Sequence, residues 1–180
     1  MGGRIWVESE LGKGAKFLFT AKMLCDIKDY FPESDFDDND GVPVDSVHGE
    51  FNGKKLLIVE DMEINREILI SLLDGTGLDI DTAENGKEAL GMVMAYPEEY
   101  DLVFMDMQMP EMDGLEATKR IRAFEKQNNE KNGLKNVPII AMTANVFQED
   151  IEKCHAAGMN DHIGKPLDIT KVLEKLRQYL

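Results

Sequence analysis

The chain has 180 residues, a formal net charge of −15 and a hydrophobic content of 43%. This composition can supply a packed core for one full domain plus an appendage. The acidic balance argues against binding to nucleic acid or to an acidic membrane surface. No apolar run approaches the ~20 residues of a membrane helix, and the opening residues lack a secretory signal. The two cysteines, Cys25 and Cys154, form no CxxC motif, which is typical of a protein from a reducing cytoplasm without a disulfide framework or zinc site.

Residues 1–25 are predicted to form two strands, GRIWVES and GAKFLFTAKM, joined by the turn ELGKG. The second segment alternates apolar and polar side chains, as a half-buried strand does. Residues 26–52 are rich in Asp, Ser, Pro and Gly and have no sustained period. We interpret them as a solvated, flexible, acidic linker. Residues 53–180 then form the main domain.

In the main domain, strand and helix signals alternate with short connections. Apolar runs such as KKLLIVE and DLVFMDM are typical of strands buried on both faces of a parallel sheet. Helical spacing follows, as in INREILISLLDG with Ile64, Ile68 and Leu72. Asn85 and Asp113 can cap the next two helices, of which the second is predicted to be GLEATKRIRAFEKQ, before the polar stretch NNEKNGLKN. Five βα units indicate an α/β fold with an open, five-stranded parallel sheet covered by helices on both faces.

Polar side chains stand at the carboxyl ends of four predicted strands, where open parallel sheets bind their ligands. Glu60 and Asp61 follow the first strand, Asp106 ends the third, Thr143 ends the fourth and Lys165 follows the fifth. Three crowded carboxylates favour a hard cation such as Mg²⁺. Such a cation could align a phosphoryl group for attack by Asp106, with Lys165 and Thr143 contacting its oxygens. Each residue alone could equally cap a helix or form a surface ion pair, but the set favours a shared function.

Residues 53–180 resemble the receiver domain of two-component signalling proteins. The matching motifs are LLIVED, DLVFMDMQMPEMDG, PIIAMTAN and GMNDHIGKPL, in the family's order. The resemblance implies a flavodoxin-like (βα)5 fold with strand order 2-1-3-4-5. It further implies a Mg²⁺-dependent transfer of a phosphoryl group from a phosphohistidine to Asp106, which switches the conformation of the domain. The donor would be the dimerisation domain of a histidine kinase or a histidine phosphotransfer protein.

The resemblance also implies a set of metal ligands. Asp61 would bind Mg²⁺ directly, together with the phosphoacceptor Asp106. Glu60 would contribute through a water molecule, and the backbone carbonyl of Gln108 would complete the protein ligands. These roles follow from the family and not from the spacing of the residues alone.

The same resemblance makes Thr143 the switch hydroxyl and Lys165 the amine that pairs with the phosphoryl group, with a cis bond between Lys165 and Pro166. The family's switch aromatic stands three residues before the lysine, and here that residue is His162. Two interpretations of His162 remain open. It is either a switch residue coupled to Thr143 or an ordinary polar residue of the surface.

The segment MGGRIWVESELGKGAKFLFT resembles the last conserved stretch of histidine-kinase ATP-binding domains, with Ala15 at the usual threonine position. It implies a fragment of a hybrid sensor histidine kinase that begins just inside the catalytic domain. Because the DxGxG and phosphodonor-histidine motifs are missing, we expect no ATP-dependent kinase activity from the fragment itself. It would catalyse only the phosphorylation and dephosphorylation of its own aspartate. We expect the fragment in the cytoplasm, while other regions could anchor the parent kinase in a membrane.

Alternative functions depend on features that the sequence lacks. A flavodoxin-like module binding flavin mononucleotide would have the same layout, but the acidic, glycine-free loop DMEINRE would repel a phosphate. A fragment of a self-contained kinase would need the missing ATP motifs. A calcium loop in DMQMPEMDG fails the EF-hand spacing and contains Pro110.

Overall fold

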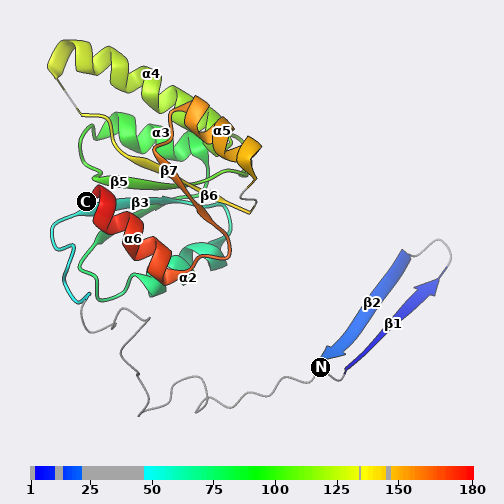
Figure 1. Cartoon of the computed structure of the whole chain (residues 1–180). Helices are drawn as coiled ribbons and strands as arrows, with labels where there is room; N and C mark the ends of the chain where they lie inside the picture. The colour runs from blue at the N-terminus through cyan, green and yellow to red at the C-terminus, as the bar shows by residue number, and fades with distance from the viewer. Residues whose placement is uncertain (1–2, 11–13, 22–46, 134, 145–146) are drawn as a thin grey trace. The chain divides into compact units, whose positions relative to one another are not determined.

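A computed structural model describes residues 3–10, 14–21, 47–133, 135–144 and 147–180 (Figure 1). The chain divides into two compact units, residues 1–40 and 41–180, which are described separately. Within the described ranges, no helix combines the length and apolar character needed to cross a bilayer. The elements in chain order are β1 (Gly3–Glu10), β2 (Gly14–Ala21), β3 (Lys55–Val59), α2 (Glu63–Leu72), β4 (Asp79–Ala83), α3 (Gly86–Ala95), β5 (Leu102–Asp106), α4 (Gly114–Asn132), β6 (Ile139–Thr143), α5 (Gln148–Ala157), β7 (Asp161–Gly164) and α6 (Ile169–Tyr179).

The first unit contains an antiparallel pair of strands. β1 pairs with β2 from Gly3 opposite Ala21 to Glu10 opposite Gly14. The sequence prediction of two strands is therefore confirmed for these residues, while residues 11–13 of the predicted turn ELGKG lie outside the described part. Most of the predicted linker, up to residue 46, lies outside it as well.

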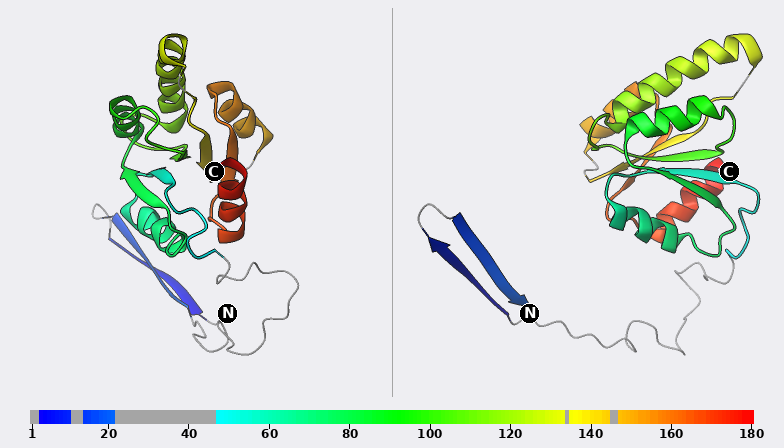
Figure 2. Two further views of the ribbon diagram at one scale, coloured as in Figure 1. Left: turned by 90° about the vertical axis from the view of Figure 1, so that its left-hand side faces the viewer. Right: turned by 180° about the vertical axis from the view of Figure 1, so that it is seen from behind.

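The second unit is a five-stranded parallel sheet in the order β4-β3-β5-β6-β7. Counted from β3 as the first strand, this is the predicted order 2-1-3-4-5, and the flavodoxin-like fold is confirmed. Figures 1 and 2 show α3, α4 and α5 over one face of the sheet and α2 and α6 over the other. The open sheet thus has the two covered faces that its continuous apolar strands predicted.

Alternate side chains of the central strands enter two separate cores. In β3, Leu57 and Val59 belong to the core beneath α3, α4 and α5, whereas Leu56 and Ile58 belong to the core beneath α2 and α6. All four side chains have no exposed surface. Because successive side chains of a strand point to opposite faces, a strand between two helical layers must be apolar at every position. The strands, held rigidly in this way, fix the positions of the residues at their carboxyl ends.

Two helices of this unit have the caps that the sequence predicted. The Asn85 side chain accepts a hydrogen bond from the Glu88 amide at 2.9 Å, and the Asp113 side chain accepts one from the Glu116 amide at 2.8 Å. Such caps satisfy amides that have no partner within the first turn of a helix. Asp113 is therefore used as a cap at the end of the loop that follows β5.

Helix α4 is longer than predicted, since it ends at Asn132 and not at Gln127. Residues 128–132 of the polar stretch, which was predicted to be a connection, continue the helix. Polar residues such as Glu and Lys have good helix propensity, so their lack of apolar periodicity does not end a helix. The chain leaves the helix at Gly133, whose φ of 70° is readily adopted only by glycine.

Residues just before β3 also pack into the core of the second unit. Val47 and Phe51 are 5% and 6% exposed and belong to the core beneath α2 and α6. The Phe51 amide donates to the Thr76 carbonyl at 2.9 Å. Arg177 of α6 donates two hydrogen bonds to the Glu50 carboxylate, at 2.8 and 3.0 Å. Composition alone, by which these residues counted as linker, did not reveal this packing.

Candidate functional site

The carboxyl ends of the parallel strands bring the five predicted side chains into the lining of one cleft. Glu60 and Asp61 follow β3, Asp106 ends β5, Thr143 ends β6 and Lys165 follows β7. They come from positions as much as 105 residues apart in the chain. The site is therefore a product of the parallel sheet, whose strand ends must meet at one edge.

Three of these side chains form an acidic cluster. Carboxylate oxygens of Glu60, Asp61 and Asp106 lie within 4.8 Å of one another. Glu60 and Asp106 are only 2% and 6% exposed, whereas Asp61 is exposed to solvent. Carboxylates so close together repel one another, and burial adds to that cost. An all-oxygen donor set that is open on one side fits Mg²⁺, which keeps several waters when it binds to proteins.

Lys165 joins the two buried members of the cluster. Its Nζ donates a hydrogen bond to Glu60 Oε2 at 2.5 Å and lies 2.9 Å from Asp106 Oδ2. Burial alone would lower the pKa of Lys165, but the contacts with Glu60 and Asp106 raise it overall. The lysine is thus held protonated beside the carboxylate of Asp106, where it can pair with an anion. The predicted cis bond between Lys165 and Pro166 is confirmed.

The carboxyl group of Asp106 is harder to ionise than that of an ordinary aspartate. Burial raises the pKa of Asp106, and the charge of Glu60 raises it further. The hydrogen bond and charge of Lys165 and a hydrogen bond from the Gln108 amide, at 3.5 Å, act in the opposite direction without cancelling the shift. An additional cation beside Asp106 would therefore stabilise the ionised, nucleophilic form.

The loop after β5 packs tightly against Asp106. The Gly114 amide donates to the Met107 carbonyl at 3.2 Å. A Cβ atom added to Gly114 would lie 2.1 Å from the Asp106 carbonyl oxygen, so only glycine fits at this position. Gln108, whose backbone carbonyl was predicted to bind the metal, lines the cleft from this loop.

The two predicted switch residues differ in their position relative to the cleft. Thr143 is 5% exposed and lines the cleft, and its carbonyl accepts a hydrogen bond from the Lys165 amide at 2.7 Å. His162 lies outside the residues that line the cleft. Its Nδ1 atom is 3.8 Å from Asp161 Oδ1, and its side chain is 25% exposed.

Three polar residues of the cleft were not predicted from the sequence. Asn65 of α2 donates to Glu60 Oε1 at 2.7 Å. Asp150 and Lys153 of α5 form an ion pair at 2.8 Å and also line the cleft. All three lie in the first two turns of the helices that follow site-bearing strands, and this position was the available signal.

Comparison with known proteins identifies the family. Residues 56–177, more than half of the chain, match the sequence pattern of the response regulator receiver domain. A curated relative is the probable histidine kinase 1 of Oryza sativa subsp. indica, 40% identical over 154 residues, which cover 72% of this chain and 16% of that kinase. The chain therefore belongs to the response regulator receiver domain family. It spans less than one fifth of the length of the curated relatives that it matches.

Solved structures agree with this family. One is the co-crystal structure of the histidine phosphotransfer protein Ypd1 and the receiver domain of Ssk1 from Saccharomyces cerevisiae. The matched chain is 36% identical with a TM-score of 0.66, and the match covers 72% of this chain and 90% of that one. Another is the receiver domain of the sensor histidine kinase PA1611 from Pseudomonas aeruginosa PAO1, with a magnesium ion coordinated in its active-site cleft. It is 34% identical with a TM-score of 0.60, covering 71% of this chain and 97% of that one.

Proposed function

We propose that this chain is the phosphoacceptor of a two-component phosphorelay, in which Asp106 accepts a phosphoryl group from a phosphohistidine. The observation that carries the proposal is the buried cluster of Glu60, Asp61 and Asp106 with Lys165 in contact with two of its members. A cluster of this kind combines an acceptor carboxylate, donors for a metal and a fixed positive charge. Membership of the receiver family and the Mg²⁺-bound cleft of a related receiver domain support the same assignment.

The proposed reaction transfers the phosphoryl group between two side chains. A carboxylate oxygen of Asp106 forms a bond to phosphorus while the bond between phosphorus and the donor imidazole nitrogen breaks, and the electron pair of that bond returns to the imidazole. Mg²⁺, held by Asp61 and Asp106, by Glu60 through water and by the Gln108 carbonyl, would neutralise charge on the phosphoryl oxygens. Lys165 would leave Glu60 to pair with one of these oxygens.

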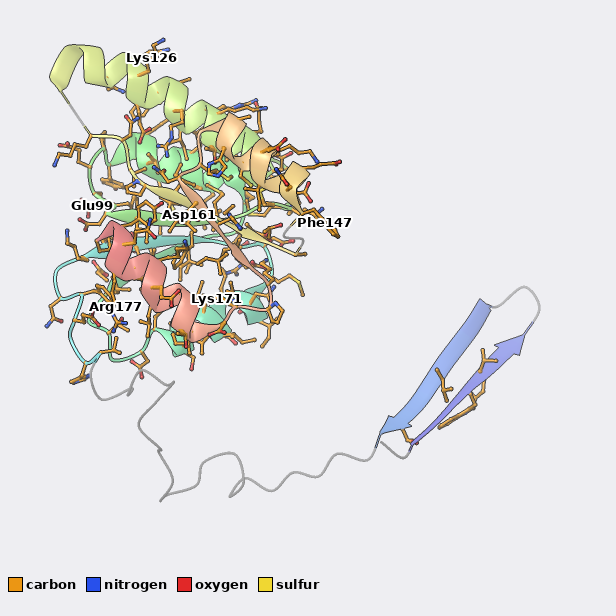
Figure 3. The ribbon with its side chains drawn as sticks, viewed as in Figure 1. Glu99, Lys126, Phe147, Asp161, Lys171 and Arg177 are labelled. Carbon is orange, nitrogen blue, oxygen red and sulfur yellow. The ribbon has the colours of Figure 1, made fainter. Side chains whose placement is uncertain are left out.

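The donor is proposed to be a histidine kinase dimerisation domain or a histidine phosphotransfer protein. Large apolar side chains lie exposed on the segments that follow site-bearing strands: Met62, which lines the cleft, and Ile64 of α2 are each 54% exposed, Ile68 of α2 is 50% exposed and Phe147, just before α5, is 68% exposed. Figure 3 shows Phe147 projecting outward at the start of α5. Exposed apolar side chains around a reactive site are typical of a surface that binds another protein. A related receiver domain has been solved together with a histidine phosphotransfer protein.

We further propose that the chain is part of a hybrid sensor histidine kinase. Residues 1–25 would be the end of its ATP-binding domain, residues 26–52 a linker and residues 53–180 the receiver domain. The curated relatives are histidine kinases, and the paired strands β1 and β2 agree with the resemblance of residues 1–20 to the end of a kinase domain. The parent would then be the ATP-dependent enzyme, working in the cytoplasm. This chain would act only on its own aspartate.

Intact mass measurement after incubation with Mg²⁺ and acetyl phosphate tests the phosphoacceptor. We expect one added phosphoryl group on the wild-type chain and none on Asp106→Asn or without Mg²⁺. Asp81→Asn is the matched control, because Asp81 lies in the middle of β4, outside the lining of the cleft, and its carboxylate contacts Lys55 at 3.2 Å. It should be phosphorylated normally. Phosphorylation that persists in Asp106→Asn, or the absorbance of a bound flavin, would overturn the proposal.

A further inference from the structure

Arg66 of α2 braces the turn that carries two of the three clustered carboxylates. Its Nη1 donates hydrogen bonds to the backbone carbonyls of Glu60 at 2.7 Å and Asp61 at 3.0 Å. Its Nη2 donates to Glu84 Oε1 at 3.0 Å. The Arg66 side chain is only 12% exposed, so its guanidinium is fixed within the structure. A planar guanidinium can satisfy several acceptors at once in this fork-like geometry.

Asn65 and Lys165 hold the Glu60 side chain, but the backbone of the turn has few other constraints. β3 ends at Val59 and α2 begins at Glu63, and Met62, the residue before the helix, supplies no side-chain cap. The Glu60 amide donates to the Ala83 carbonyl at 3.1 Å, which ties the start of the turn to β4. Arg66 fixes the next two peptide groups, and the direction of a peptide group determines where the adjoining side chains point.

Glu84 gives the guanidinium an anchor on the neighbouring strand. It follows β4 directly, and β4 lies beside β3 in the sheet. The contact therefore links the turn after β3 to the turn after β4 through one side chain. Because both turns follow adjacent strands of a rigid sheet, the contacts of Arg66 with the two turns fix its position relative to the acidic cluster.

The contacts of Arg66 show that it fixes the backbone of the turn and does not simply compensate the charge of the carboxylates. Its side-chain hydrogen bonds to the described residues go to two carbonyls and to Glu84, and none goes to a carboxylate of the cluster. The cation that contacts the cluster carboxylates is Lys165 instead. Arg66 thus acts on the backbone that carries the ligands and not on the ligands themselves.

We infer that Arg66 is a positioning residue of the metal site, which orients the carboxylates of Glu60 and Asp61 toward Asp106 by fixing the two carbonyls between β3 and α2. This inference rests on the proposed function, because it takes the cluster to be a Mg²⁺ site. Partners that orient metal ligands without binding the metal change affinity by about 10- to 100-fold when they are removed.

Arg122 offers a matched control within the same domain. It too is largely buried, with 17% of its side chain exposed, and it too donates to two backbone carbonyls, those of Gly158 at 2.8 Å and Val137 at 2.9 Å. It also pairs with one glutamate, Glu125, at 2.6 Å. None of these residues lines the cleft of the cluster. Loss of Arg122 should therefore destabilise the fold without displacing the metal ligands.

The experiment measures Mg²⁺ binding by isothermal titration calorimetry on the full chain, with folding of each variant checked by circular dichroism. We expect the dissociation constant of Arg66→Met to rise by about 10- to 100-fold. Arg66→Lys should be nearly as weak, because a lysine keeps the charge but cannot span both carbonyls and Glu84. Arg122→Met should bind Mg²⁺ within about twofold of wild type.

Three results would overturn the inference: Arg66→Met with wild-type affinity, Arg66→Lys with restored affinity, or Arg122→Met with an equal loss. The second would mean that only the charge matters, and the third that any loss of stability weakens the site. If Arg66→Met does not fold, Arg66→Lys decides the question alone. A wild-type chain that binds no Mg²⁺ would overturn the proposed function and this inference with it, whereas wild-type binding with unaffected Arg66 variants would overturn the inference alone.

Discussion

The two ends of the parallel sheet each hold a lysine surrounded by carboxylates, and the two lysine side chains are equally exposed, at 22%. At the amino ends of the strands, Lys55 contacts Glu99 at 3.1 Å and Asp81 at 3.2 Å, and these carboxylates are 48% and 36% exposed. Figure 3 shows Glu99 at this edge of the domain and Phe147, the residue before α5, at the opposite edge. The Lys55 cluster is thus a solvated set of ion pairs.

At the carboxyl ends, the same chemical groups occupy a buried position. The side chains of Glu60 and Asp106, which contact Lys165, are 3% and 9% exposed. Water screens the repulsion between exposed carboxylates, but it cannot do so for buried ones. One lysine does not compensate for three carboxylates there, so the cluster gains from a further cation. Burial, and not the identity of the charges, separates a candidate metal site from a salt-bridged surface.

The largest expected difference between the two clusters follows from removing each lysine. We expect Lys165→Met to lower the free energy of unfolding by about 2–3 kcal/mol, since it leaves two buried carboxylates without their cation. Lys55→Met should have a much smaller effect, because solvent replaces the lost partner. Urea unfolding with and without Mg²⁺ measures both, and Mg²⁺ should recover part of the loss only in Lys165→Met. Equal losses in the two variants would contradict the role assigned to burial.

Neutralising Asp106 is expected to change the free energy of unfolding by a smaller amount and in the opposite direction. Because burial raises the pKa of Asp106, the folded chain binds this proton more tightly than the unfolded chain does. Stability therefore falls as the pH rises through the window between the usual aspartate pKa of ~3.9 and the raised pKa. Asp106→Asn removes this cost and should raise the free energy of unfolding at pH 7.

The control for that variant is Asp81→Asn, which weakens the contacts of Asp81 with Lys55 at 3.2 Å and with the Tyr100 hydroxyl at 2.8 Å. We expect it to lower stability at pH 7. The increase in the free energy of unfolding that Asp106→Asn causes should shrink as the pH falls from 7 toward 4 in a series of urea titrations. A gain that grows at acid pH would mean that the pKa of Asp106 is lowered and not raised.

Much of this comparison could be anticipated from the sequence. Strands buried on both faces must be apolar at successive positions, so the ends of β3 and β5, and with them Glu60 and Asp106, could be located from the pattern of residues. The order of the strands came from the resemblance to receiver domains, because apolar periodicity does not say which strands are neighbours. The degree of burial at the two ends of the sheet came only from the structure.

Features that depend on the direction of a side chain could not be predicted. The spacing of Ile64 and Ile68 predicted α2 correctly, but these residues are 54% and 50% exposed, whereas Leu69 and Leu73 pack in the core. Two apolar stripes one residue apart give the same helical period, so the sequence does not decide which one faces the sheet. The bracing contacts of Arg66 were hidden for a similar reason, since an arginine in a first helical turn can equally point into solvent.

The smallest expected effect is that of ionic strength, which tests the comparison between the Lys55 and Lys165 clusters most directly. Salt screens interactions between exposed charges, with a Debye length of about 10 Å at 0.1 M and about 3 Å at 1 M, and acts much less on buried pairs. The stability difference between wild type and Lys55→Met should therefore disappear into experimental error as sodium chloride is raised from low concentration to about 1 M. The difference for Lys165→Met should persist, because its partners Glu60 and Asp106 are shielded from the added ions. If salt removed both differences alike, the two clusters would be electrostatically equivalent, and burial could not be the reason that only one of them forms a candidate metal site.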